Sequence, residues 1–329
     1  METKGNILLD IKDLHVWYKV YGGYLKVLNN LHLTVREGER VGLVGEAGCG
    51  KTTTMKSILQ ILPPGDFRIP QGEIFYKGQD VLKMNPKELQ SLRSKEVAMI
   101  FQDPTAALNP VFTIGTQIGD VIKYSSVLKG DSHKEKIKEE SIKALKEVYL
   151  PDPERMRINY PFQLSGGMRQ RVCIAMSISS PRNLILADEP GTSLDVTIQD
   201  QIHRLLNEIV KKKNTAIILI THSLGVAREM TDRIYVMYAG TIVETAVPEI
   251  LFENPVHPYT KGLLASIPKI SGGGIAKGIP GRIPDYLNPP SGCRFRLRCQ
   301  QESPICSEKA PQLFEVEKDH LVACYLSQR

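Results

Sequence analysis

Residues 45–52, GEAGCGKT, have the types and spacing needed to hold a chain of phosphates. The segment follows the apolar run Arg40–Val44 and precedes a helical stretch, which is the setting that a phosphate-binding loop requires. Its glycines let backbone amides close around phosphates, Lys51 adds a positive charge, and the Thr52 hydroxyl can ligate Mg²⁺. We therefore predict a nucleoside-triphosphate site. Its residues are Gly45, Glu46, Ala47, Gly48, Cys49, Gly50, Lys51, Thr52 and Thr53.

An acidic pair follows a second apolar run, in the segment LILADEP. Asp188 and Glu189 stand at the end of a predicted strand, where carboxylates can face bound phosphates. Asp188 is suited to hold Mg²⁺ through water, and Glu189 is suited to polarise the water that attacks the terminal phosphate. Together with the glycine-rich loop, this pair indicates nucleotide hydrolysis.

A second possible anion cradle lies in QLSGGMRQR, residues 163–171. Ser165, Gly166 and Gly167 come directly before an apparent helix, whose free amides and positive dipole end favour an anion. We predict that these three residues also contact a phosphate. The helix should have one apolar face, formed by Met168, Val172, Ala175 and Met176.

The hydrophobic pattern predicts the strands and helices that carry these segments. Residues 7–20 alternate apolar and polar side chains, and a Gly22–Gly23 turn leads to a second such run, which indicates an N-terminal antiparallel β layer. Further on, the apolar strands at 184–187 and 216–220 alternate with helical stretches, which is typical of a mostly parallel sheet. The predicted fold class is therefore α/β, with a P-loop ATPase core and an added antiparallel layer.

Composition shifts along the chain predict its domain organisation. Residues 108–180 are charge-rich and helical, and we expect a helical subdomain there. Its longest helix should bury a face made of Ile137, Ile142, Leu145 and Val148. After residue 240 the chain becomes rich in Pro and Gly and includes the segment Ser271–Gly274, SGGG. We predict a nucleotide-binding domain over 1–240 and a small C-terminal domain over 241–329.

Charge and hydropathy exclude several classes of protein. The chain has 329 residues, and its net charge of +6 comes from scattered Lys and Arg residues. The run Lys211–Lys213 is best explained as a solvated helix end, so we expect no nucleic-acid partner. Apolar runs such as Ala216–Ile220 are too short to span a membrane, and METKGNILLD does not have the form of a signal peptide. We expect a cytosolic protein.

A set of motifs in a fixed order along the chain resembles that of the ATPase subunit of ATP-binding cassette (ABC) transporters. Beside the phosphate loop and the acidic pair, they are LSGGMRQR, FQDPTAALNP with Gln102, SLD with Asp195 and ITHSLG with His222. The resemblance implies a head-to-tail dimer that encloses two ATP molecules. In such a dimer, Ser165 of one subunit faces the γ-phosphate that the phosphate loop of the other subunit holds.

The resemblance also implies roles for the remaining motif residues. Gln102 should contact Mg²⁺ and the attacking water, Asp195 should communicate across the dimer, and His222 should hydrogen-bond the γ-phosphate. Glu189, His222 and Gln102 are thus the expected catalytic residues. Tyr18 matches the aromatic residue that stacks on adenine, and Trp17 is its competitor, because strand alternation turns only one of them toward the site.

Two positions depart from the family pattern. Gly191 stands where threonine is frequent, and Ser223 follows His222 where aspartate is usual. These changes bear on the rate of turnover and on communication between subunits, and ATP binding should be unaffected. They keep open the alternative of an ATP-binding regulatory subunit.

Residues 253–268, ENPVHPYTKGLLASIP, resemble the C-terminal signature of the dipeptide and oligopeptide branch of ABC importers. The branch implies two transmembrane permeases, a second and paralogous ATPase subunit, and an extracellular binding protein, with this chain peripheral on the cytoplasmic face of the membrane. The cargo stays open, since relatives serve nickel complexes or oligosaccharides. A soluble ABC ATPase that acts on nucleic acid or ribosomes is a further alternative, although such chains usually carry two cassettes.

Four of the six cysteines lie near the end of the chain, at Cys293, Cys299, Cys306 and Cys324. Their spacing lacks the CxxC pairs of most zinc sites, while Cys₄ ligation suits an iron–sulfur cluster. Resemblance to peptide-importer ATPases implies a [4Fe-4S] cluster, and zinc or free thiols remain alternatives. Arg294, Arg296 and Arg298 should offset the charge of the thiolates. Cys49 and Cys173 are expected to be packing residues.

Overall fold

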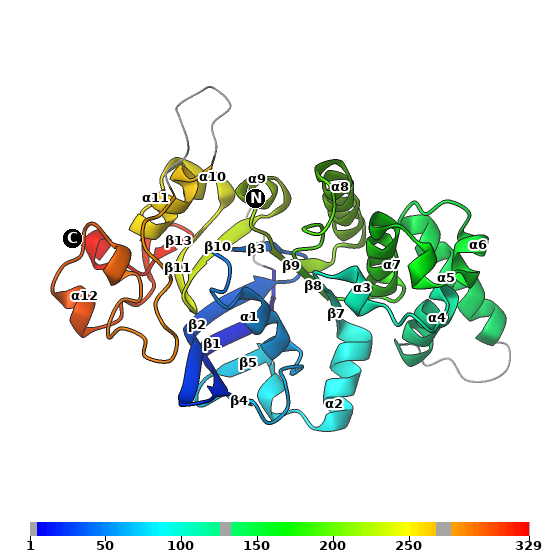
Figure 1. Cartoon of the computed structure of the whole chain (residues 1–329), viewed down its shortest axis with the longest axis horizontal. Helices are drawn as coiled ribbons and strands as arrows, with labels where there is room; N and C mark the ends of the chain where they lie inside the picture. The colour runs from blue at the N-terminus through cyan, green and yellow to red at the C-terminus, as the bar shows by residue number, and fades with distance from the viewer. Residues whose placement is uncertain (1–4, 126–132, 268–277, 329) are drawn as a thin grey trace. The chain divides into compact units, whose positions relative to one another are not determined.

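The computed structural model describes residues 5–125, 133–267 and 278–328. The chain forms two compact units: the first comprises residues 1–83 and 220–329, and the second residues 84–219 (Figure 1). Each is described by itself. The predicted glycine segment Ser271–Gly274 lies outside the described residues. Within the described residues, no helix has the length and apolar character needed to cross a membrane.

The N-terminal part of the first unit is an antiparallel sheet, which confirms the predicted layer. Its long strands β1 (Ile7–Val20) and β2 (Gly23–Arg36) pair with each other. Strand β1 also pairs with β4 (Phe67–Arg68) and with β5 (Glu73–Tyr76), which pairs with β6 (Gln79–Asp80). Alternating side chains such as Leu9, Ile11 and Leu33 are buried, because one face of the sheet packs into the core.

The second sheet of the first unit carries the phosphate loop. Strand β3 (Arg40–Val44) ends at the loop, which leads into α1 (Lys51–Ile58). β3 pairs in parallel with β10 (Arg233–Tyr238), and β10 pairs antiparallel with β11 (Thr241–Ala246). β13 (His320–Val322) and β12 (Phe314–Glu317) continue the sheet beyond β11.

Short helices complete the first unit. They are η1 (Val81–Lys83), α9 (Leu224–Met230), α10 (Pro248–Glu253), α11 (Pro258–Ala265), η4 (Arg296–Arg298), α12 (Ile305–Glu308) and η5 (Tyr325–Gln328). Tyr259 and Phe295 of the C-terminal part share one hydrophobic core with Val44, Val236 and Tyr238. These two residues of the C-terminal part therefore pack on the core of the phosphate-loop sheet. The predicted boundary at residue 240 stays a prediction.

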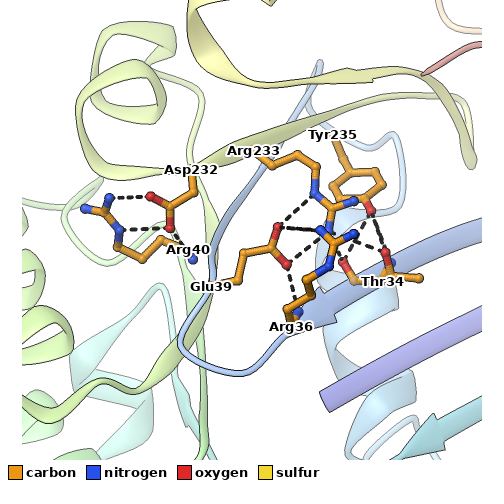
Figure 2. Close-up of polar contacts among 7 residues, drawn as sticks. All are labelled: Thr34, Arg36, Glu39, Arg40, Asp232, Arg233 and Tyr235. Carbon is orange, nitrogen blue, oxygen red and sulfur yellow. Dashed lines mark hydrogen bonds and ion pairs between the residues drawn. The ribbon is translucent and has the colours of Figure 1, made fainter. Parts of the chain in front are cut away.

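A polar cluster lies at the beginning of β3, at the opposite end from the phosphate loop (Figure 2). Arg233 donates to both carboxylate oxygens of Glu39, with Nε–Oε1 at 2.9 Å and Nη2–Oε2 at 3.0 Å. The Tyr235 hydroxyl lies 3.2 Å from Thr34 Oγ1, and Asp232 accepts from Arg40. Because the side chains of Glu39 and Arg233 are almost buried, this pair joins the end of β2 to the starts of β3 and β10.

The second unit combines parallel strands with a group of helices. Strand β7 (Val97–Ile100) pairs in parallel with β8 (Leu184–Asp188), and β9 (Ala216–Ile220) follows β8 in the sheet. The helices are α2 (Pro86–Ser91), η2 (Leu92–Glu96), α3 (Pro104–Ala107), α4 (Ile114–Ser125), α5 (His133–Glu147), α6 (Pro153–Ile158), η3 (Pro161–Gln163), α7 (Gly166–Ile178) and α8 (Val196–Lys213). Helices α4 to α7 lie together, where the helical subdomain was expected (Figure 1).

The environment of α7 differs from the prediction of a single apolar face. Val172 and Ala175 are buried as expected, whereas Met168 and Met176 are only half-buried. Cys173, Ile174 and Ile178 are also buried. The reason is tertiary, since α3, α4, α5 and α8 all pack against α7 and cover it on several sides.

Candidate active site

The phosphate loop of the first unit has the backbone that phosphate binding requires. Gly50 is left-handed, with φ at 109°, and no side chain caps α1, so the first-turn amides are not occupied by a cap. Gly45 has φ at 152°, and a Cβ there would lie 2.1 Å from the carbonyl oxygen of Met237. A larger residue at position 45 therefore cannot keep the loop on β10.

Lys51 lies inside the loop. Its Nζ donates to the carbonyl oxygens of Gly45 at 2.8 Å and Glu46 at 3.0 Å, and the residue is buried. Cys49 is fully buried, and burial raises the pKa of its thiol although the nearby Lys51 opposes the shift. Cys49 thus packs as an uncharged residue, as does Cys173, whose pKa burial raises to about 12.

Tyr18 and Trp17 have different surroundings within the first unit. The Tyr18 hydroxyl lies 3.3 Å from Thr53 Oγ1, so this side chain reaches the start of α1. Trp17 instead stands 6.3 Å from the ring of Tyr24, with Lys26 Nζ over its own ring at 5.5 Å. Of the two aromatic residues, Tyr18 is the one hydrogen-bonded to the phosphate-loop helix.

In the second unit, the predicted general base Glu189 is held by two neighbours. Gln102 Nε2 and Thr192 Oγ1 each donate to Glu189 Oε2 at 3.0 Å. Glu189 has a left-handed backbone with φ at 46°, an unfavourable conformation for a residue other than glycine. Strained backbone of this kind is frequent at functional sites, and Glu189 has it directly after the end of β8.

Three further predicted residues of the second unit lie at the ends of elements. Asp188 is buried at the end of β8. Ser165 caps α7 by accepting from the amide of Met168 at 3.3 Å, and Asp195 caps α8 by accepting from Ile198 at 3.0 Å. Gly166 and Gly167 are the first residues of α7, so the Ser165 segment is a helix start as predicted.

His222 and Ser223 follow Ile220 in the first unit. His222 is exposed, and Ser223 caps α9 by accepting from the amide of Val226 at 3.4 Å. Because an aspartate can cap a helix in the same manner, Ser223 retains the local role of the more usual residue. At the other departure, a Cβ on Gly191 would lie 2.7 Å from Gln199 Cγ, so Gln199 fills the space that a threonine would need.

The predicted residues therefore form two groups, one in each unit. The first unit brings together the phosphate loop and Tyr18 and also carries His222. The second unit joins Gln102 to Glu189 and carries Asp188, Ser165 and Asp195 at strand and helix ends.

The four C-terminal cysteines line one small cavity of about 20 Å³ in the first unit, beside Phe295 and Tyr325. The amide of Cys293 donates to the carbonyl of Cys306 at 2.8 Å, and burial raises the pKa of Cys293 to about 11. Among the residues that the structure describes, no three metal-ligating side chains are grouped so as to hold a metal ion. The structure thus gathers the thiols at one cavity without a formed metal-binding group.

The three arginines between Cys293 and Cys299 have partners other than the cysteines. Arg298 pairs with Glu46, and Arg296 Nη1 donates to Glu302 at 3.2 Å. Arg294 Nη1 donates to the carbonyl oxygen of Lys26 at 3.0 Å and to that of Ala239. The hydrogen-bond partners of the three arginines are thus carboxylates and carbonyl oxygens, and the offset of thiolate charge stays a prediction.

Sequence reasoning missed the side chains that hold the phosphate loop from outside. Tyr259, Tyr286 and Arg298 all contact Glu46 or Gly48. Tyr259 belongs to the C-terminal signature, but nothing in its local pattern relates it to residues more than two hundred positions earlier. Only the placement of Glu46, a charged residue inside a glycine-rich loop, hinted at a partner.

Comparison with known proteins agrees with this geometry. Residues 28–192 match the family described as ABC transporter, and residues 243–306 match the oligopeptide/dipeptide transporter C-terminal region. The oligopeptide transport ATP-binding protein OppD of Bacillus subtilis is 43% identical over 97% of this chain and 88% of its own length. The dipeptide transport ATP-binding protein DppD of the same organism is 39% identical over 98% and 95%.

A solved structure has the same cassette fold. It is the dimer of the ATP-binding cassette MJ0796 bound to ADP and Pi, which is 25% identical, covers 73% of this chain and 98% of its own, and has a TM-score of 0.65. The chain is an ATPase of the ATP-binding cassette class. It belongs to the ABC transporter family, in the branch defined by the oligopeptide/dipeptide transporter C-terminal region.

Proposed function

We propose that this protein is the ATP-hydrolysing subunit of an ABC importer for dipeptides or oligopeptides. It converts ATP and water to ADP and phosphate and passes the free energy to transmembrane partners. The observation that carries hydrolysis is the Gln102–Glu189–Thr192 group at the end of β8. Support for peptides as cargo comes from the match of residues 243–306 and from the peptide-transport relatives.

The residues divide the work of hydrolysis. Lys51 and the loop amides bind the phosphates, Tyr18 stacks on adenine, and His222 hydrogen-bonds the γ-phosphate. Glu189 takes the proton of the attacking water, and its bond from Gln102 orients the carboxylate. The oxygen-bearing residues suited to hold Mg²⁺, which neutralises phosphate charge when bound, are Thr52, Gln102 and Asp188.

Two ATPase subunits act together in this proposal, head to tail and as a pair of paralogues. The Ser165 hydroxyl and the start of α7 in one subunit complete the γ-phosphate site of the other, and Asp195 communicates between them. The start of α7 at Gly166 and Gly167 supports this role. Its first turn contains no acidic residue that would repel a phosphate. Hydrolysis removes the phosphate that both subunits hold, so the pair separates.

An exposed apolar patch on the second unit supports docking to the permeases. The loop before α4 presents Val111 and Phe112, and the end of α6 with the segment that follows it presents Ile158, Tyr160 and Phe162. The amide of Ile114 donates to the carbonyl of Asn159 at 2.9 Å, which places the two segments side by side. Patches of this kind mark protein interfaces, and we assign this one to permeases that hold the protein at the cytoplasmic face of the membrane. An extracellular binding protein would deliver the peptide.

The variant Glu189→Gln tests the assignment of hydrolysis. We expect ATP binding to persist, turnover to fall by about a thousandfold or more, and a closed dimer to accumulate with MgATP. The control is Glu139→Gln on the exposed side of α5, which should hydrolyse ATP normally. Unchanged hydrolysis in Glu189→Gln would remove this residue from its role.

Purification of the native complex, together with measurements of peptide uptake, tests the assignment of peptides as cargo.

We also propose that Cys293, Cys299, Cys306 and Cys324 hold a [4Fe-4S] cluster, with zinc as the alternative. The donor set supports this, since four soft thiols line one cavity. When bound, such a group would hold together the parts of the C-terminal segment that carry the four cysteines.

Anaerobic purification tests the cluster. The protein should be brown, with broad absorbance in the visible blue and about four irons per chain, and Cys306→Ser should lose both. The control Cys173→Ala should keep them. A colourless preparation, with or without zinc, would overturn the cluster.

A further inference from the structure

An arginine from the cysteine-bearing segment holds the second residue of the phosphate loop. Arg298 Nη1 and Nη2 donate to Glu46 Oε2 at 2.8 Å and Oε1 at 3.0 Å. The same guanidinium donates to the carbonyl oxygens of Ile279 and Pro280 at 2.9 Å. The Arg298 side chain is only 5% exposed, and that of Glu46 is 28% exposed. Glu46 is thus anchored by a bidentate pair of fixed direction.

Two tyrosines hold the loop backbone beside this pair. The amide of Glu46 donates to the Tyr259 hydroxyl at 2.9 Å, and the Tyr286 hydroxyl donates to the carbonyl of Gly48 at 2.8 Å. The Tyr259 ring is fully buried, 4.7 Å from Tyr238 and 5.5 Å from Phe295. The loop is therefore bonded to side chains that the core itself immobilises.

These bonds set the direction of two peptide planes in the loop. In a trans peptide the carbonyl and the amide point in opposite directions. With the Glu46 amide on Tyr259, the Gly45 carbonyl must point away, and it accepts from Lys51 at 2.8 Å. Because the Gly48 carbonyl accepts from the Tyr286 hydroxyl, the Cys49 amide of the same peptide points the other way. It donates to the Glu46 carbonyl at 3.3 Å. The loop is shaped by contacts that do not involve phosphate.

The turn Cys293–Cys299 approaches the loop with two arginines. Arg294 donates to the carbonyl oxygens of Lys26 and Ala239. Gly240, which follows Ala239 in the chain, donates its amide to the carbonyl oxygen of Cys49 at 2.8 Å. Phe295, between the two arginines, is 3% exposed and packs in the core. Cys293 and Cys299, at the ends of the turn, line the cysteine cavity.

We propose that Arg298, with Tyr259 and Tyr286, is a positioning residue for ATP binding. It keeps the phosphate loop in its binding shape before the nucleotide arrives, so that ATP does not have to order it. The same turn carries Cys299 next to Arg298, and a change at the cysteine cavity reaches the ATP site through this bond. The proposal rests on ATP binding at the loop and holds with or without a bound cluster.

The conservative variant Arg298→Lys tests the proposal, because it keeps the charge and loses the bidentate geometry. We expect the Kd of a fluorescent ATP analogue and the KM for ATP to rise about tenfold, with kcat within about twofold and the unfolding midpoint near that of the parent protein. Tyr286→Phe should raise the Kd by about threefold. The matched control is Arg296→Lys in the same turn, whose partner is Glu302, and it should leave the Kd unchanged.

A double-variant cycle separates positioning from a general loss of structure. The double variant Glu46→Gln with Arg298→Lys should raise the Kd no more than either single variant, because each substitution removes the same interaction. An unchanged Kd in Arg298→Lys, or independent addition of the two effects, would overturn the proposal. Failure of Glu189→Gln to affect turnover would refute the hydrolytic role while leaving this result intact.

The link to the cysteines has its own measurement. Cys299→Ser should raise the Kd for the ATP analogue in the parent protein and have little further effect in Arg298→Lys. Equal effects in both backgrounds would show that the cavity does not act through Arg298.

Discussion

An arginine–glutamate pair stands beyond each end of β3, and the two pairs have different roles. Glu39 and Arg233 lie before the strand, where they join β2, β3 and β10 (Figure 2). Glu46 and Arg298 lie after it, where they hold a loop with no regular secondary structure. In both pairs the arginine donates to both carboxylate oxygens, Arg233 through Nε and Nη2 and Arg298 through Nη1 and Nη2. What differs is the backbone that each pair restrains, so one should act on stability and the other on ligand binding.

The largest expected effect comes from breaking the first pair. Arg233→Ala leaves Glu39 almost buried without its partner and should lower the free energy of unfolding by about 3 kcal/mol. The KM for ATP of the folded protein should not change. Urea unfolding and steady-state hydrolysis measure the two quantities.

Arg40→Ala is the control for that variant, since Arg40 pairs with the more exposed Asp232 in the same cluster. It should cost less than about 1 kcal/mol of unfolding free energy. If Arg233→Ala changed the KM as strongly as Arg298→Lys, the distinction between the two ends of β3 would be lost.

Two tyrosine variants sharpen the comparison at smaller amplitude. Tyr259→Phe leaves the Glu46 amide without its acceptor and should lower the free energy of unfolding by about 1–2 kcal/mol while also raising the KM for ATP. Tyr235→Phe removes the hydroxyl beside Thr34 and should cost about 1 kcal/mol without an effect on the KM. Unfolding and kinetic measurements on both variants test this difference. Equal KM values for Tyr259→Phe and Tyr235→Phe would contradict the assignment of ligand binding to one end of β3 alone.

The smallest effect concerns Cys49, inside the held loop. Burial raises the pKa of its thiol, so the reactive thiolate is scarce at neutral pH and becomes more abundant as the pH rises. Iodoacetamide should therefore label Cys49 very slowly near pH 7 and faster in alkaline solution, as should the control Cys173. Rapid labelling of Cys49 alone near neutral pH would mean that the phosphate loop opens readily.

The sequence alone determined the local chemistry of this protein. The spacing of GEAGCGKT, LSGGMRQR and LILADEP predicted the loop, the Ser165 helix start and the placement of Asp188 and Glu189, because each depends on neighbours along the chain. The antiparallel layer followed from strand alternation in the same manner. Periodicity also predicted strands at 184–187 and 216–220, which β8 and β9 contain.

Only the tertiary structure decided which distant side chains meet. Arg298 is 252 positions from Glu46, and no local pattern distinguishes it from Arg296, which turns to Glu302. In the same way, α7 is covered on several sides because four helices surround it. Pairings of this kind depend on how the core brings segments together, and that is a property of the whole folded chain and not of any stretch of it.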